Sequence, residues 1–196
     1  MSQISRVAGI FAGIVLLALG ALAIGIGLSG QGDVSTTLKQ EFMTGAPDMT
    51  PAAIAAEAKA ANMPKVPGMP TCSVAGKKIK TGSDARCFEE YMRIQALEMT
   101  GGRPSALVPQ FLTAAGKETN DLAQASIDPK SHQPAINPAF NVWVYEDALS
   151  TPLDVAYLIQ QLSLFAILLG VGFLLLGICA LLISVGKMRS AKTAAA

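Results

Sequence analysis

The sequence contains little of what metal sites and acid–base catalysis need. It has one histidine, His132, and three cysteines among 196 residues. A facial iron site takes two histidines and a carboxylate, and no G-x-S-x-G turn supports a Ser-His-Asp triad. The nucleotide motifs G-x-x-x-x-G-K-[ST] and G-x-G-x-x-G are also absent from the sequence. We therefore predict no enzymatic activity, no metal and no cofactor, and we interpret His132 as a solvated loop residue.

Charge is absent from the two longest apolar runs, Val7 to Leu28 and Leu162 to Val185. Each run is at least about 20 residues long, which lets a helix cross a hydrocarbon core of about 30 Å. Ion and proton paths normally use ionisable side chains inside the spans, so a transport function for the isolated chain is disfavoured. The net charge of +1 does not indicate a basic surface for binding nucleic acid.

The charges that flank these runs predict an orientation. Arg6 precedes the first run, Lys187, Arg189 and Lys192 follow the second, and all 14 acidic residues lie between the two runs. Because cytoplasmic ends carry the Lys/Arg excess, we predict a two-pass plasma-membrane protein with both ends in the cytoplasm. Its expected parts are a cytoplasmic N-terminus (1–6), transmembrane helix 1 (7–28), an extracytoplasmic loop domain (29–154), transmembrane helix 2 (155–186) and a cytoplasmic basic tail (187–196).

A cleaved signal peptide is the competing interpretation of the first run. Ala21-Leu22-Ala23 resembles a small-residue cleavage site. The apolar stretch continues to Leu28, so cleavage would fall inside a run that is longer than the roughly 7–15 residues typical of signal peptides. We favour an uncleaved anchor, but the sequence leaves cleavage open.

Small residues recur every seven positions in both runs, and the first run also has a GxxxG pair at its start. In lipid, helices associate by close packing at small residues, and this spacing keeps them on one face of a left-handed pair. We therefore predict a two-helix transmembrane hairpin, although glycine is also generally frequent in such helices. Whether the seams pair within the chain or with another subunit stays open. The residues are Gly9, Gly13, Gly20, Gly27, Ser163, Gly170, Gly177 and Ser184.

Between the runs, the pattern predicts a mainly helical, Pro-rich domain. Thr50 before Pro51 starts one helix, which Pro64, Pro67 and Pro70 end. Further predicted elements are a Gly-rich exit (29–33), two short strands around Gly76 (71–75 and 77–81), a helix capped by Ser83 (84–100), and helices at 105–116, 137–149 and from 151 onward.

The helix expected over 84–100 has an apolar and a charged face. Phe88, Tyr91 and Met92 form a candidate apolar contact face. The opposite face is expected to be exposed and carries Glu89, Glu90 and Arg93. A group of aromatic residues near the second run suits an interfacial belt: Phe140, Trp143, Tyr145 and Tyr157.

Cys72 and Cys87 are the best-defined pair in the exported segment, where thiols are oxidised. A disulfide closing this short loop would stabilise the domain by about 3 kcal/mol. Two free thiols or a metal pair are the alternatives, but the spacing, without a nearby histidine, fits no zinc site. Cys179 lies inside the second run and is expected to be a small packing residue.

From Ala96 onward, ALEMTGGRPSALVPQFLTAAGK and then IDPKSHQPAINPAFNVWVYEDALSTPLDVAYLIQQLSLFAILLGVG resemble small two-span membrane proteins of actinobacteria. The resemblance depends on the short motifs TGGR, NPA-x-N-x-W and ALST and covers roughly the second half of the chain. The resemblance implies two membrane spans with an exported loop between them, and it does not imply a particular activity. Some relatives have names suggesting an aromatic ring-opening dioxygenase, but this chain lacks the two histidines of such iron chemistry.

These observations favour a non-enzymatic membrane accessory or scaffold protein whose exported domain contacts a membrane or envelope partner. The alternative is a membrane-anchored ligand- or lipid-binding module that uses the apolar contact face, and an anchored enzyme comes third. The expected partners are the lipid bilayer and either another membrane protein or a second copy of the chain. The partner's identity cannot be predicted from the sequence.

Overall fold

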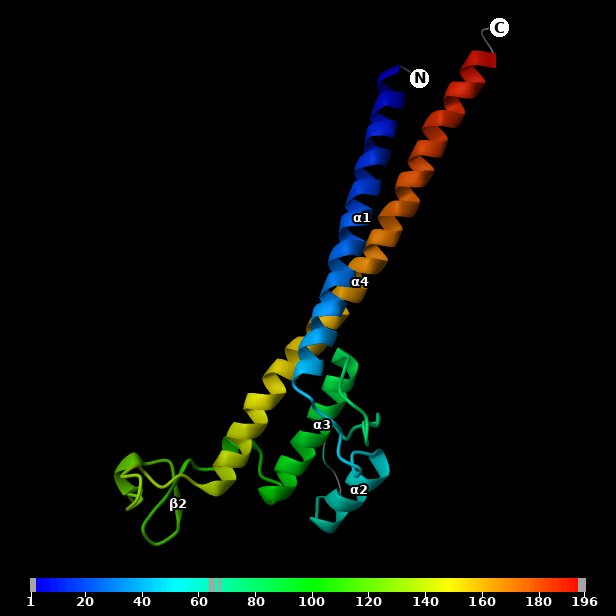
Figure 1. Cartoon of the computed structure of the whole chain (residues 1–196). Helices are drawn as coiled ribbons and strands as arrows, with labels where there is room; N and C mark the ends of the chain where they lie inside the picture. Colours follow the sequence, from blue (N-terminus) through cyan, green and yellow to red (C-terminus); the bar gives the residue numbers. More distant parts are fainter. Residues whose placement is uncertain (1–2, 64–65, 67, 194–196) are drawn as a thin grey trace. The chain divides into compact units, whose positions relative to one another are not determined.

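The chain is mainly helical, as predicted, and two of its helices are long and apolar. The computed structural model describes residues 3–63, 66 and 68–193, and Figure 1 colours them along the sequence. The predicted helix-ending residues Pro64 and Pro67 lie outside this range. The elements are helices α1 (Gln3–Gln40), α2 (Pro51–Ala60), α3 (Gly82–Met99) and α4 (Pro138–Thr193), 3-10 turns Ser105–Leu107 and Leu122–Gln124, and strands β1 (Phe111–Leu112) and β2 (Glu118–Thr119).

Residue contacts divide the chain into two units. We call residues 1–36 and 158–196 the helix-pair unit, and residues 37–157 the middle unit. The helix-pair unit holds most of α1 and the longer, apolar part of α4. The middle unit holds α2, α3, both strands and the polar beginning of α4.

Helix α1 is longer than the sequence predicts. The expected Gly-rich exit at 29–33 is helical, and the helix continues to Gln40. A glycine in a helix costs about 1 kcal/mol relative to alanine, and packing offsets this cost. A Cβ on Gly30 would touch the Ser163 side chain, and Val34, seven residues after Gly27, is only 6% exposed.

Helix α4 is continuous through Pro152, where the sequence predicts two helices that meet near Thr151. It begins at Pro138 as predicted, and the Asn137 side chain accepts a hydrogen bond from a first-turn N–H at 3.0 Å. Pro152 has no N–H to donate to the preceding turn. The helix continues past this one missing backbone bond, and the Thr151 hydroxyl donates to the Asp147 carbonyl of the preceding turn at 2.8 Å.

Helices α2 and α3 begin at side-chain caps. Thr50 accepts a hydrogen bond from the N–H three residues later at 3.2 Å, and Pro51 follows it, as predicted. The predicted cap of α3, Ser83, is wrong, because the cap is Thr81. Thr81 accepts from the Asp84 N–H at 3.0 Å, and the Asp84 carboxylate accepts from the Thr81 N–H at 3.2 Å. This reciprocal pair satisfies two backbone donors together.

The predicted strand pair around Gly76 is wrong. Segments 71–75 and 77–81 do not form strands, and both hydrogen-bond to the chain that follows α1. The Gly45 N–H donates to the Lys77 carbonyl and the Gly76 N–H donates to the Gly45 carbonyl, both at 2.9 Å. A Cβ on Gly45 would overlap a neighbouring carbonyl oxygen, so this close contact needs glycine.

The segment between α3 and α4 is irregular, where the sequence predicts a helix over 105–116. After a 3-10 turn, β1 pairs antiparallel with β2. Gly116 has φ +73° and donates its N–H to the Thr113 carbonyl at 2.8 Å, which makes the turn between the strands. A left-handed glycine favours a turn over a helix here. His132 lies exposed in the following loop, as expected.

Candidate functional site

Helices α1 and α4 lie side by side in the helix-pair unit (Figure 1). Their predicted small residues face each other. Gly20 lies against Gly170: a Cβ on either residue would be 2.8 or 2.7 Å from the carbonyl oxygen of the other. Gly13 lies against Gly177 in the same way, at 3.1 and 2.9 Å. A real Cβ essentially never comes closer than 3.0 Å, so the two backbones leave no room for a side chain.

Serines complete this contact, which we call the glycine seam. A Cβ on Gly27 would lie 2.6 Å from the Ser163 carbonyl oxygen, and one on Gly9 would touch the Ser184 side chain. The Ser184 hydroxyl donates to a carbonyl of its own helix at 2.8 Å, which satisfies its donor without a second helix. All eight predicted residues therefore lie in one seam. From Gly13 to Gly27, each step of seven residues along α1 meets a step of seven residues back along α4.

The other faces of these helices are apolar and exposed. Phe11 is 69% exposed, Ile26 68% and Leu168 71%. Only 11% of the most apolar window of each helix is buried, whereas a core helix of a soluble protein would be mostly buried. Both helices are long and apolar enough to cross a membrane.

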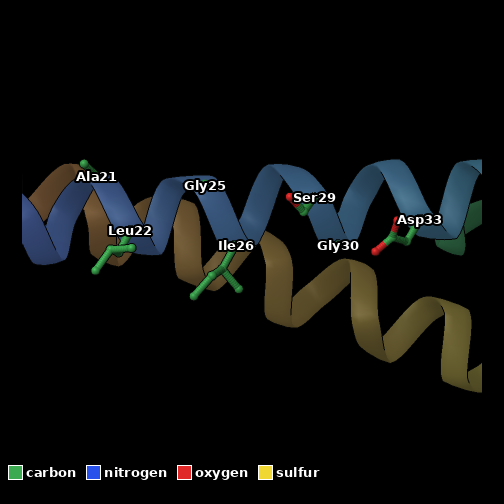
Figure 2. Close-up of a pocket in the computed structure, with 7 residues that line it drawn as sticks. All are labelled: Ala21, Leu22, Gly25, Ile26, Ser29, Gly30 and Asp33. Atoms are coloured by element: carbon green, nitrogen blue, oxygen red, sulfur yellow. The ribbon is translucent and has the colours of Figure 1, made fainter.

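Figure 2 shows a shallow open groove on α1, with a volume of about 650 Å³. Gly25 has no atom within 4 Å of its Cβ position, so its missing side chain contributes to the hollow. Because every lining residue belongs to one helix, the groove is a feature of an exposed helix face and not an enclosed site. The lining residues are Ala21, Leu22, Gly25, Ile26, Ser29, Gly30 and Asp33.

In the middle unit, a disulfide and a buried tyrosine join α3 to the segment that precedes it. The sulfur atoms of Cys72 and Cys87 are 2.03 Å apart, as predicted. The Tyr91 hydroxyl donates to the Cys72 carbonyl at 2.7 Å, so α3 holds the preceding segment both covalently and by a hydrogen bond. Cys179, predicted to pack inside the second run, is instead exposed on α4.

The predicted apolar contact face is wrong for its central residue. Tyr91 is 0% exposed, and Phe88 and Met92 are half-buried. Trp143, assigned to an interfacial belt, is 5% exposed, and its indole N–H donates to the Arg103 carbonyl at 3.1 Å. Tyr91 and Trp143 therefore belong to the core of the middle unit, while Phe88 and Met92 stay partly exposed.

A polar contact that the sequence does not reveal joins α3 to the beginning of α4. The Arg86 guanidinium donates to Asp154 at 2.6 Å, and the same nitrogen lies 3.1 Å from Glu89 Oε2. Glu89 is 7% exposed, so its predicted place on an exposed face is wrong. Its Oε2 accepts no well-aligned hydrogen bond within the described part of the chain, because the Arg86 group is directed at Asp154.

Glu146 is the second buried acid, on the α4 side and outside the predicted transmembrane helix. It is 7% exposed. Burial raises the pKa of Glu146 to about 7, with Asp147 and Glu89 adding to the shift and Arg93 opposing it. Burial also raises the pKa of Glu89. Neither acid stands out in the sequence, because only the packing of α4 on α3 removes them from water.

Neither metal chemistry nor known relatives assign a function. Among the described residues, no three His, Cys, Asp or Glu side chains are grouped so that they could hold a metal ion. Comparison with models of protein families, with curated proteins and with solved structures finds no match. The geometry of the two units is therefore the basis for a functional proposal.

Proposed function

We propose that this chain is a non-enzymatic, two-pass accessory protein of the plasma membrane whose exported middle unit contacts another membrane or envelope protein. The observation that carries the proposal is the backbone contact of Gly20 with Gly170 between helices whose other faces are apolar and exposed. Lipid would cover those faces, while close packing at small residues would hold the helices as a transmembrane hairpin.

Several features support this placement. Disulfides persist in oxidising compartments, and the pair Cys72–Cys87 fits an exported middle unit. The Lys/Arg charges of both chain ends favour cytoplasmic termini. Gly9 and Gly13 belong to the glycine seam but precede the candidate cleavage site, so cleavage would remove part of the seam. A retained first span is consistent with that contact.

Cysteine labelling in intact cells tests the topology. In a Cys179→Ser background, Gln40→Cys and Lys192→Cys are made separately and treated with a membrane-impermeant thiol reagent. We expect labelling at position 40 in intact cells, and at position 192 only after the membrane is permeabilised. Labelling at position 192 but not at 40 in intact cells would reverse the orientation.

Native co-purification tests the accessory role. The chain, expressed at its natural level, is extracted in a mild detergent, and its mass and its companions are measured by mass spectrometry. We expect one other membrane or envelope protein at a fixed ratio. A chain that elutes without a stoichiometric partner, or that turns over a substrate through residues of the middle unit, contradicts the proposal.

A further inference from the structure

Two carboxyl groups are buried where α3 packs against the beginning of α4. Glu89 and Glu146 are each 7% exposed, and the two come from different helices. Buried acids are normally paired or fully hydrogen-bonded, yet Glu89 Oε2 lacks an aligned donor among the described residues. Burial disfavours the ionised form of such a group and leaves the protonated form acceptable.

The charged groups that face this acid pair are mostly of the same sign. One guanidinium, from Arg86, lies 2.6 Å from Asp154, 3.1 Å from Glu89 and 3.5 Å from Glu90. It therefore serves three carboxylates and cannot fully compensate any one of them. The groups around the pair are Arg86, Glu90 and Arg93 on α3, and Asp147 and Asp154 on α4.

We propose that the contact between α3 and the beginning of α4 is a proton-controlled clamp, closed when Glu146 is protonated and loosened when Glu89 and Glu146 are both ionised. Ionising the second acid adds another negative charge to an interface that already holds Glu90, Asp147 and Asp154. The resulting loss of stability affects the contact between α3 and α4, because both acids lie in that contact. This inference concerns the middle unit alone and does not rest on the proposed accessory role.

The direction of the response follows from the raised pKa of Glu146. A group whose pKa rises on folding, here from 4.5 to about 7, stabilises the folded form fully at pH values below its unfolded pKa. That stabilisation is lost as the pH rises through the folded value. The clamp is therefore most stable in acidic surroundings and becomes weaker as the pH rises from about 4.5 to 7.

Hydrogen–deuterium exchange of the full chain in detergent tests the clamp. Exchange is followed by mass spectrometry at pH 5.5 and pH 8.5 and corrected for the intrinsic pH dependence of exchange. In the wild type we expect peptides from α3 and from residues 138–157 to lose protection by at least about tenfold at the higher pH, because the pKa of Glu146 rises on folding by more than one unit and one unit is a factor of ten. Peptides from α2 serve as an internal reference and should not change.

Glu146→Gln keeps the shape of the side chain and cannot ionise, so its α3 and α4 peptides should stay protected at both pH values. Glu41→Gln, a change at an exposed acid, is the matched control and should respond as the wild type does. Equal protection of the wild type at both pH values overturns the proposal, as does a pH response in Glu146→Gln as large as that of the wild type. If Glu146→Gln does not fold, Glu89→Gln must flatten the response in its place.

Discussion

The helix-pair unit and the middle unit are held together in opposite ways. In the helix-pair unit the contact is made by the smallest residues, and the backbones at Gly20 and Gly170 touch. In the middle unit the contacts are made by large buried side chains such as Tyr91 and Trp143, which donate hydrogen bonds to carbonyls outside the helices, and by a disulfide. Water drives large apolar side chains together, whereas in lipid only close packing and hydrogen bonds favour association. This contrast fits our proposal that lipid surrounds the helix-pair unit and water surrounds the middle unit.

The largest effect should come from filling the glycine seam. Gly20→Leu or Gly170→Leu places a side chain where a Cβ alone would lie 2.8 or 2.7 Å from a backbone oxygen. Overpacking of a tight contact typically costs about 1–3 kcal/mol and more when the backbone must move, so the helices should separate. The measurement is the yield of a crosslink between Gly9→Cys and Ser184→Cys, which should fall at least tenfold.

Two other glycines of the same helices provide the control. Gly25 and Gly172 have no atom within 4 Å of their Cβ positions. Gly25→Leu and Gly172→Leu add the same apolar volume without touching the other helix, so the crosslink yield should stay at the wild-type level. Equal yields from all four variants would remove the glycine seam as the cause of pairing.

The second effect should be confined to the middle unit. Cys72→Ser removes the disulfide and should lower the free energy of unfolding of this unit by about 2–4 kcal/mol. Chemical denaturation, followed by the fluorescence of the single tryptophan, Trp143, measures this loss. Cys179→Ser, at an exposed position in α4, is the control and should leave the transition unchanged. A transition in Cys72→Ser at the wild-type denaturant concentration would contradict a stabilising role for the disulfide.

The comparison also explains what the sequence could predict. The residues of the glycine seam could be predicted because each helix repeats its own small residues, whereas the sequence left open whether the two repeats pair with each other or with another subunit. The cap Thr50 and the disulfide partners are likewise close in the chain. The acid pair could not be predicted, because nothing in the sequence of α3 shows which of its faces α4 covers. The ion pair that joins the two helices, Arg86 with Asp154, links residues that are 68 positions apart. The pairing of Gly45 with the segments around Gly76 was missed for the same reason.

A smaller effect separates the core tyrosine from an exposed one. Tyr91→Phe removes the hydroxyl that donates to the Cys72 carbonyl at 2.7 Å and leaves that acceptor without this partner. The expected loss is about 1–2 kcal/mol in the free energy of unfolding, measured by the same denaturation. Tyr145→Phe, at a residue that is 71% exposed, should change it by less than about 0.5 kcal/mol. Equal losses from the two variants would argue against a core role for Tyr91.

The smallest effect should come from an exposed acid whose pH response is opposite to that of Glu146. Glu118 accepts hydrogen bonds from Arg103 at 2.6 and 3.0 Å and from Asn137 at 2.9 Å. These bonds lower the pKa of Glu118 from 4.5. A group with a lowered pKa adds stability above its unfolded pKa, and that stability is lost as the pH falls through the folded value.

Glu118→Gln should therefore be less stable than the wild type at pH 6, and the difference should shrink as the pH falls toward 3, because the wild-type acid then becomes neutral as well. Since the pair is solvent-exposed, 0.5 M salt should reduce the difference at pH 6. The comparison is made by thermal unfolding at each pH, with Glu41→Gln as the control for removing an acid elsewhere. A difference that stays constant from pH 6 to pH 3 would mean that the ionised form of Glu118 does not stabilise the middle unit.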